Sequence, residues 1–254
     1  METRLDAPVN QKMYDELGER WYSANDDPVA LLRAESRKRN KWIAEEVRNA
    51  FAERQVRLLD VGCGAGFLSN ELAREGLLVT GLDASESSLG IARMHGDPDR
   101  VAYQRGDAYN LPHEDESFEI ICAMDLLEHI SDPGQVINEI ARVLKPHGLF
   151  FFHTFNRNLL SYLVIIKGVE WFVRNTPRNM HVLRLFIKPS ELREMCGRSG
   201  LTLKVLRGFG PKAGHPAFWH MLLTGIVRED FEFEFTKSTL MGYIGFAVKE
   251  RVDR

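Results

Sequence analysis

The sequence predicts an α/β protein with a mostly parallel sheet of seven strands and helices on both faces, plus a helical N-terminal cover and an insert. Three observations predict this class. From Arg57 onward, short apolar runs alternate with segments of helical periodicity, which is typical of a sheet covered by helices. The early runs each end in Gly, Asp or Asn. The length of 254 residues, 44% of them hydrophobic and 27% charged, fits one large domain or two small ones.

Seven apolar runs are the expected strands, and helices are expected between them. The runs span residues 57–62, 78–83, 101–107, 118–125, 148–156, 201–209 and 239–249. Helical periodicity falls at residues 67–76, 85–94, 131–148 and 188–200. Ser85 and Asp132 stand where N-cap side chains accept backbone hydrogen bonds. The third helix is expected to lay one apolar face on the sheet, formed by Val136, Ile137, Ile140 and Leu144.

Three segments fall outside this alternation. Residues 1–50 look helical and are expected to form an N-terminal cover, while residues 51–254 form the main domain. Residues 157–187 are an insert in that domain, with a high density of apolar and aromatic side chains. Residues 210–236 are expected to be a loop that contains Gly and Pro and ends in an alternating FEFEF segment.

Charge and cysteine content exclude several classes of protein. The chain has 33 Lys and Arg against 36 Asp and Glu, a formal net charge of -3, so no global positive field would hold a nucleic acid. Three widely spaced cysteines argue against a disulfide framework or a structural zinc site. No leader segment stands at the start, and no apolar stretch reaches the roughly 18 residues of a membrane span. We therefore expect a cytoplasmic protein that acts on a small molecule.

A glycine-rich loop follows the first strand and precedes a helix. After Asp60 it carries three closely spaced glycines, Gly62, Gly64 and Gly66. Glycine lets the backbone turn tightly and approach a ligand closely. A dinucleotide fingerprint would place its third glycine one residue later, and a P-loop would need a following Lys and Ser or Thr. Asp83 ends the second strand and can accept hydrogen bonds from both hydroxyls of a ribose, and Asp107 ends the third strand near an expected adenine edge.

Two carboxylates and an imidazole follow the fourth strand. If the chain makes a helical turn there, Asp125, Glu128 and His129 are spaced i, i+3 and i+4 and project from one face. Such a set suits Mg²⁺, Mn²⁺ or Zn²⁺ with positions left open for water. The same residues could instead hold part of a cofactor or take a proton with no metal present. His129 suits proton transfer, because the ordinary pKa of histidine is about 6.5.

Together these motifs resemble the ubiquinone-biosynthesis O-methyltransferases, a family of class I S-adenosylmethionine-dependent methyltransferases. The resemblance runs from about residue 37 to about residue 209, through LLDVGCGAGFLSNELAREGLLVTGLDAS, MDLLEHISDP, FFHTFNRN and FIKPSEL. The glycine loop is common to all class I methyltransferases, whereas FNRN and FIKP, with KGVEW between them, are more particular. The resemblance implies a Rossmann-like fold. It also implies transfer of a methyl group from S-adenosylmethionine to a phenolic hydroxyl of a polyprenyl catechol.

The resemblance also implies roles for individual residues. Arg39, Gly62, Asp83 and Met124 would bind the cofactor, beside the other residues of the predicted nucleoside site. The resemblance further implies a divalent metal, with Mg²⁺ favoured, and its ligands would be Asp125, Glu128 and His129. Of these we predict Glu128 and His129 as the catalytic residues. Family members carry Glu where this chain has Asp125, and the shorter carboxylate could bind an ion through water.

The sequence is also compatible with two other functions. A small-molecule C- or N-methyltransferase would need the same cofactor site. A cofactor-binding scaffold without turnover would need that site alone, and the intact set of Asp125, Glu128 and His129 argues against it. The oligomeric state is left open by the sequence.

The insert at 157–187 mixes apolar, aromatic and basic side chains. The apolar and aromatic ones include Leu159, Leu160, Tyr162, Leu163, Ile165, Ile166, Trp171 and Phe172, and the basic ones are Arg157, Lys167, Arg174, Arg178 and Arg184. This composition is typical of an interfacial helix on anionic lipid. We expect either peripheral contact with the inner membrane, where a polyprenyl substrate would lie, or an insert that only covers the active site. His181 faces the substrate in one interpretation and is structural in the other, and His153 is expected to be structural.

Overall fold

The chain forms one sheet of eight strands in the order β3-β2-β1-β4-β5-β8-β6-β7. The structure, a computed structural model, describes residues 11–52, 56–177 and 180–250. The strands are β1 (Arg57–Val61), β2 (Leu78–Asp83), β3 (Val101–Arg105), β4 (Phe118–Met124), β5 (Leu144–Phe155), β6 (Leu201–Pro211), β7 (Phe233–Thr236) and β8 (Gly242–Lys249). Strands β1 to β5 pair in parallel, and β8 lies antiparallel between β5 and β6. The predicted α/β class and Rossmann-like sheet are confirmed.

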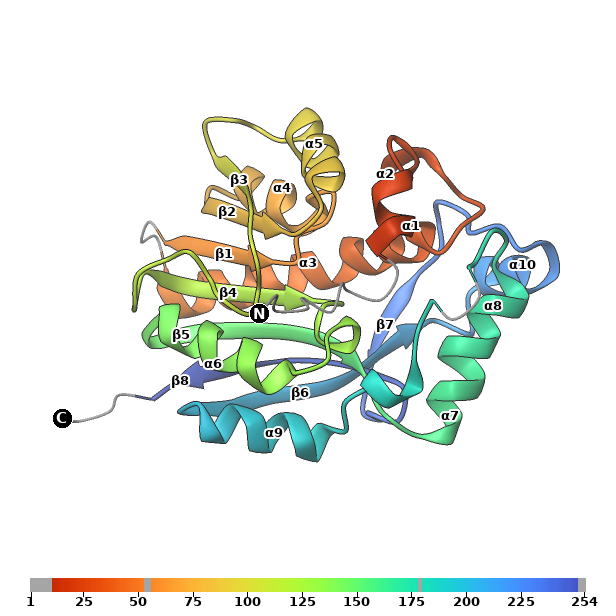
Figure 1. The fold of residues 1–254 in the computed structure, drawn as a ribbon. Helices are drawn as coiled ribbons and strands as arrows, with labels where there is room; N and C mark the ends of the chain where they lie inside the picture. Colours follow the sequence, from red (N-terminus) through yellow and green to blue (C-terminus); the bar gives the residue numbers. More distant parts are fainter. Residues whose placement is uncertain (1–10, 53–55, 178–179, 251–254) are drawn as a thin grey trace, which may run out of the picture.

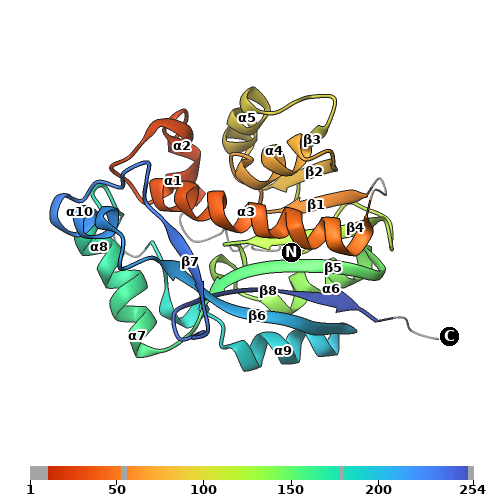
Figure 2. The same cartoon turned by 180° about the vertical axis from the view of Figure 1, so that it is seen from behind.

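Helices cover both faces of the sheet, α3 on one face and α6 and α9 on the other (Figures 1 and 2). The α-helices are α1 (Gln11–Glu16), α2 (Arg20–Ser23), α3 (Val29–Phe51), α4 (Phe67–Arg74), α5 (Glu86–His95), α6 (Pro133–Val143), α7 (Leu159–Ser161), α8 (Val169–Phe172), α9 (Pro189–Arg198) and α10 (Pro216–Thr224). Two N-caps agree with prediction: the Ser85 and Asp132 side chains accept from the backbone N–H groups of Ser88 and Gln135, each at 3.1 Å.

Successive side chains of β5 point to opposite faces of the sheet and form two cores. Phe151 packs under α3, where its ring lies 5.6 Å from that of Trp42, centroid to centroid. Phe150 and Phe152 belong to the other core. That core contains the predicted apolar face, Val136, Ile137, Ile140 and Leu144, all fully buried. The strand period of two residues therefore places the sheet between two buried layers.

The segment 210–236 differs from the predicted loop. It contains the helix α10 and an eighth strand, β7, which pairs antiparallel with the end of β6. The Phe233 and Phe235 rings lie 5.5 Å and 5.2 Å from that of Phe209. The alternating FEFEF segment is thus a strand because one set of its side chains has an aromatic surface to cover. The predicted sheet of seven strands gains one strand at its edge.

The helix predicted at 131–148 also ends earlier than expected, because α6 stops at Val143 and β5 begins at Leu144. Pro146 follows closely, and the residue before a proline avoids the helical region.

The N-terminal helices and the insert gather at one end of the sheet, together with α10 (Figures 1 and 2). The long helix α3 is part of the layer that covers the sheet, so α1 and α2 are the described parts of the predicted N-terminal cover that stand over this end. Residues 1–10 of the predicted cover lie outside the described residues. In the insert, α7 and α8 are joined by a π-helix, Tyr162–Gly168, and α8 contacts α10. In the described parts of the chain, none of the helices has the length and apolar character to cross a bilayer.

Candidate active site

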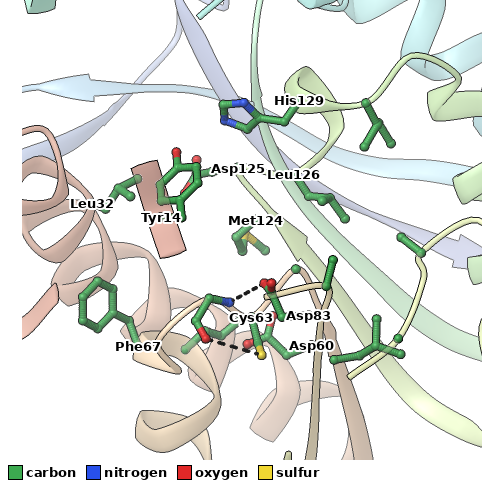
Figure 3. Close-up of a pocket in the computed structure, with 18 of the residues that line it drawn as sticks. Tyr14, Leu32, Asp60, Cys63, Phe67, Asp83, Met124, Asp125, Leu126 and His129 are labelled. Atoms are coloured by element: carbon green, nitrogen blue, oxygen red, sulfur yellow. Dashed lines mark hydrogen bonds between the residues drawn. The ribbon is translucent and has the colours of Figure 1, made fainter. Parts of the chain in front are cut away.

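A cavity of about 570 Å³ opens at the carboxyl ends of the strands, where the strand order reverses between β1 and β4. Ligands of open α/β sheets bind at such a switch point. The walls come from the loops after β1, β2, β3 and β4, and from α1, α2 and α3 (Figure 3). The cavity wall includes many of the predicted site residues: Arg39, Asp60, Gly62, Gly64, Asp83, Asp107, Met124, Asp125 and His129.

The glycine loop is fastened to the end of β2. The Asp83 carboxylate accepts from the backbone N–H groups of Gly64, at 2.9 Å, and Ser85, at 2.8 Å. Gly66 has a φ of +81°, and a Cβ there would overlap the Tyr103 hydroxyl. Glycine is therefore required at this position by backbone conformation and by space. The loop and the acid are thus joined by hydrogen bonds at one end of the cavity (Figure 3).

Three other predicted cofactor residues, Asp60, Asp107 and Met124, differ in their partners. Asp107 was expected to end the third strand, but β3 ends at Arg105 and Asp107 lies in the turn that follows. Asp60 accepts from the Ser69 hydroxyl at 2.6 Å, so it ties β1 to α4, and burial raises its pKa to about 6. Asp107 accepts from the backbone N–H of Tyr109 at 2.9 Å, which closes a turn beside the cavity. Met124, the last residue of β4, is buried in the cavity wall.

The turn after β4 is not the α-helical turn expected from the sequence. Asp125 has a φ of +54°, in the left-handed region. A short 3₁₀ helix, Leu127–His129, follows it. The expectation that Asp125, Glu128 and His129 share one α-helical face is therefore wrong. A strained backbone at a non-glycine residue in a cavity wall is common at functional sites.

Asp125 is held by two partners from other elements. Its two carboxylate oxygens bond to the Arg39 guanidinium of α3 and to Nδ1 of His153 on β5. Burial alone would raise the pKa of Asp125, but the positive charge of Arg39 and the contact with His153 outweigh it and hold the pKa well below its ordinary value. Arg39 also lies 3.4 Å from the Glu35 carboxylate. The Asp125 carboxylate is thus charged and already paired.

The spacing of possible metal ligands also differs from the prediction. In the described residues, the group of three whose ligand atoms all lie within 4.8 Å of one another is Glu35, Asp125 and His153. The predicted group of Asp125, Glu128 and His129 is not brought together in this way, because the left-handed residue turns Asp125 toward α3 and β5.

Glu128 turns toward β5, where the Thr154 hydroxyl donates to its Oε2 at 2.9 Å. Burial, followed by the nearby charge of Asp125, raises the pKa of Glu128 to about 8. Its Oε1 is buried and has no hydrogen-bond partner among the described residues. At neutral pH, Glu128 is therefore a protonated acid beside a charged one.

His129 lines the cavity and is a neutral imidazole. Burial lowers its pKa to about 4, so the ordinary value of 6.5 does not apply. Its Nδ1 is buried without a partner in the described structure. The His181 ring, at the end of the insert, lies 5.4 Å from the His129 ring, and the Tyr14 ring of α1 lies 6.2 Å from it.

Several residues of the site carried no sequence signal for their place. Tyr14 and Trp21 reach the cavity from the N-terminal helices, and a Cβ on Gly64 would lie 3.2 Å from the Trp21 ring. His153 and Thr154 are neighbours on β5, yet they hold the two acids of the turn, Asp125 and Glu128. No spacing rule indicates them, because each contact joins separate elements.

Comparison with known proteins places the chain in a family. Residues 59–152 match the family model described as a methyltransferase domain. The ubiquinone biosynthesis O-methyltransferase of Hahella chejuensis is 38% identical over 200 residues, which cover 78% of this chain and 82% of that protein. The protein of the same name from Coxiella burnetii is 40% identical over 169 residues, covering 64% and 72%.

Among solved structures, magnesium protoporphyrin IX methyltransferase from Synechocystis PCC 6803, with bound SAH, is similar with a TM-score of 0.63. The two chains are 17% identical, and the match covers 95% of this chain and 96% of that one. This likeness shows the fold alone. From the matches in sequence and the geometry of the cavity, we conclude that the chain is an S-adenosylmethionine-dependent methyltransferase and belongs to the ubiquinone biosynthesis O-methyltransferase family.

Proposed function

We propose that this enzyme transfers the methyl group of S-adenosylmethionine to a phenolic hydroxyl of a polyprenyl catechol in ubiquinone biosynthesis. One observation carries the proposal: a single cavity joins the glycine loop and Asp83 to Asp125 and His129. A cofactor bound at one end would present its methyl group to a hydroxyl held at the other, and such positioning supplies much of the rate. The names of the relatives support the choice of acceptor.

The residues at the loop end fit the nucleoside of the cofactor. Each oxygen of Asp83 accepts one backbone hydrogen bond and keeps a lone pair for a ribose hydroxyl. Asp107 and Met124 stand farther along the same wall. When it is bound, S-adenosylmethionine supplies an electrophilic methyl group on a positively charged sulfur.

When no metal is bound, His129 is the proposed acceptor of the phenolic proton. The bond between the methyl carbon and the phenolic oxygen forms while the bond from that carbon to sulfur breaks, and the proton moves to the imidazole. The ring is unprotonated at neutral pH and therefore able to accept. A base with a pKa of about 4 draws a proton weakly, so the reaction needs a phenol that is more acidic than usual.

A divalent metal ion would supply that acidity, since it polarises the oxygens that it touches. The buried atoms without partners, Glu128 Oε1 and His129 Nδ1, fit such an ion, with Mg²⁺ favoured. We propose that these two residues would hold it and that Asp125, whose oxygens face Arg39 and His153, would reach it through water. A neutral His129 that binds an ion through Nδ1 has no ring lone pair left for a proton, so with the ion bound the phenolic proton would pass to water. Because Glu128 must lose its proton to bind a cation, affinity should rise with pH up to about 8.

Titration calorimetry of the purified chain with Mn²⁺ or Mg²⁺ at pH 6.5 and 8 tests the metal proposal directly. We expect tighter binding at pH 8 and none in Glu128→Gln. Equal binding by wild type and Glu128→Gln would contradict the assignment of this ligand.

The acceptor is tested by incubating the protein with S-adenosylmethionine and a short-chain prenyl catechol, with and without a chelator. Mass spectrometry should find an O-methylated catechol that disappears with the chelator. Loss of product in Glu128→Ala, with cofactor binding retained, would agree with the proposed roles. Cofactor binding without methylation of any catechol under any metal would overturn the proposed acceptor, and a product methylated on carbon or nitrogen would identify another class of methyltransferase.

We further propose that the insert holds the enzyme, as a cytoplasmic protein, on the inner membrane. The insert exposes six large apolar side chains, Leu159, Leu160, Leu163, Val164, Trp171 and Phe172, and the neighbouring α10 exposes two more, Trp219 and Leu223. Arg174 and Arg184 add positive charge to the insert, whereas Arg157 and Lys167 are paired with Glu191 and Glu170. Arg178 lies outside the described residues. An apolar surface rimmed by basic groups suits an anionic bilayer.

Sedimentation with phosphatidylglycerol vesicles tests this contact. Replacing Trp171→Ser together with Phe172→Ser should lower vesicle binding at least about a hundredfold, because each of the two buried aromatic rings contributes about 1.5 kcal/mol or more. Met94→Ser in α5 is the control, since Met94 is 70% exposed but lies on a helix distant from α8. Vesicle binding that is equal in all three proteins would contradict the proposal.

A further inference from the structure

Tyr14 of α1 lies in the cavity wall between the two ends of the site. Its ring stacks on Trp21, with 5.5 Å between the ring centroids and 19° between the planes. It meets the His129 ring nearly at a right angle, at 86°. Figure 3 shows Tyr14 near Asp125 and Met124, above the glycine loop that holds Asp83. An aromatic ring therefore stands where the cofactor must pass from its nucleoside end to the acceptor.

The surroundings of Tyr14 favour a cation. Burial, followed by the nearby carboxyl groups of Asp125, Glu128 and Asp83, raises the pKa of its phenol. Glu128 is protonated at neutral pH, so the negative charge that favours a cation comes from Asp125. Asp125 is charged because Arg39 and His153 hold its pKa low. The tyrosine thus stays neutral, and the face of its ring keeps the negative potential of an aromatic quadrupole.

We propose that Tyr14 binds the sulfonium group of S-adenosylmethionine through the face of its ring. A nucleoside at Asp83 and a methyl group delivered toward His129 require the charged sulfur to lie between these residues, beside Tyr14. A cation over an aromatic face is attracted more strongly when both are removed from water. Once the methyl group has left, the sulfur is neutral, so Tyr14 would favour the substrate form of the cofactor over the product form.

The neighbouring residue fixes the helix that carries this ring. Asp15 accepts from the hydroxyls of Ser85 and Ser87 at the start of α5. This contact ties α1 to the element that follows Asp83. Tyr14 is therefore placed relative to the nucleoside site and does not depend on α1 alone.

Binding of the two cofactor forms tests the proposal without any acceptor. The quantity measured is the ratio of the Kd for S-adenosylhomocysteine to the Kd for S-adenosylmethionine, by titration calorimetry. Tyr14→Phe should keep the wild-type ratio, and Tyr14→Leu should lower it about fivefold, or about 1 kcal/mol. Leu32→Ala, which also changes the cavity wall but removes only aliphatic contact, should weaken both ligands equally.

A second series guards against a leucine variant that does not fold. In this series position 14 carries phenylalanine or its mono-, di- or trifluorinated form. Each added fluorine keeps the shape of the ring and reduces the negative electrostatic potential of its face. Affinity for S-adenosylmethionine should fall stepwise, while affinity for S-adenosylhomocysteine stays constant. A ratio unchanged in Tyr14→Leu, or a flat fluorination series, would overturn the role of Tyr14. Neither result depends on the proposed acceptor, because no methyl transfer is measured.

Discussion

The ion pair between Arg39 and Asp125 should contribute strongly to stability because it is almost buried. Their side chains are 6% and 12% exposed. Arg39→Met removes the charge, keeps most of the apolar stem, and leaves the Asp125 carboxylate with His153 as its remaining partner among the described residues. Breaking a buried pair costs about 3–5 kcal/mol, because one charge is left uncompensated. At about 2–4 °C per kcal/mol for a chain of this size, we expect the Tm to fall by about 6–20 °C.

Urea unfolding followed by circular dichroism measures this loss, and a double variant separates charge from packing. Arg39→Met with Asp125→Asn removes both charges, so it should be more stable than Arg39→Met alone. The difference between wild type and Arg39→Met should shrink below about pH 4, where the unpaired carboxyl of the variant is protonated. The fold lowers the pKa of Asp125, so the stabilisation is present above its ordinary pKa and is lost on acidification. If the free energy lost in the double variant equals the sum of the losses in Arg39→Met and Asp125→Asn alone, the reasoning is refuted.

Three further predictions concern single side chains. The pKa of Glu128 is about 8 in the folded protein, against an ordinary value of 4.5. Between these pH values the folded state binds one more proton than the unfolded state, so the free energy of unfolding falls as pH rises. Glu128→Gln should flatten this slope in urea melts, and an unchanged slope would contradict the prediction. Gly66→Ala should cost about 1–3 kcal/mol and weaken cofactor binding in calorimetry, whereas Gly90→Ala, with open space around it, should not destabilise. Trp42→Ala should cost about 3–5 kcal/mol in thermal melts, and a loss under 1 kcal/mol would argue against its buried contact with Phe151.

The positions of the strands and the cofactor loop were predictable because their signals are local. Apolar runs and helical periods are repeated every few residues, and the five residues from Gly62 to Gly66 are contiguous. The loop and Asp83 lie together because parallel strands end at the same edge of a sheet. The segment 210–236 was not predictable, since its strand pairs only where Phe209 offers a surface.

The conformation of the turn that carries Asp125, Glu128 and His129 was not predictable from the sequence. The spacing of Asp125, Glu128 and His129 suggested one helical face, but nothing in the spacing indicates a left-handed residue. The partners that decide its conformation are remote, since Arg39 is 86 residues from Asp125 along the chain and Thr154 is 26 from Glu128. Ordinary pKa values were equally misleading, because burial separates His129, at about 4, from Glu128, at about 8.

The sequence by itself determined the class of fold, the place of the cofactor and the family, because those depend on periodicity and contiguous motifs. Tertiary structure alone decided which acid is charged, which is protonated, and which aromatic ring enters the cavity. The physical reason is that charge state depends on desolvation and on partners brought from distant elements, both of which exist only once the chain has folded. Tyr14 is the clearest instance. Its place in a short helix indicates no function, and only the fold brings it beside Trp21, His129 and the carboxyl groups that act on it.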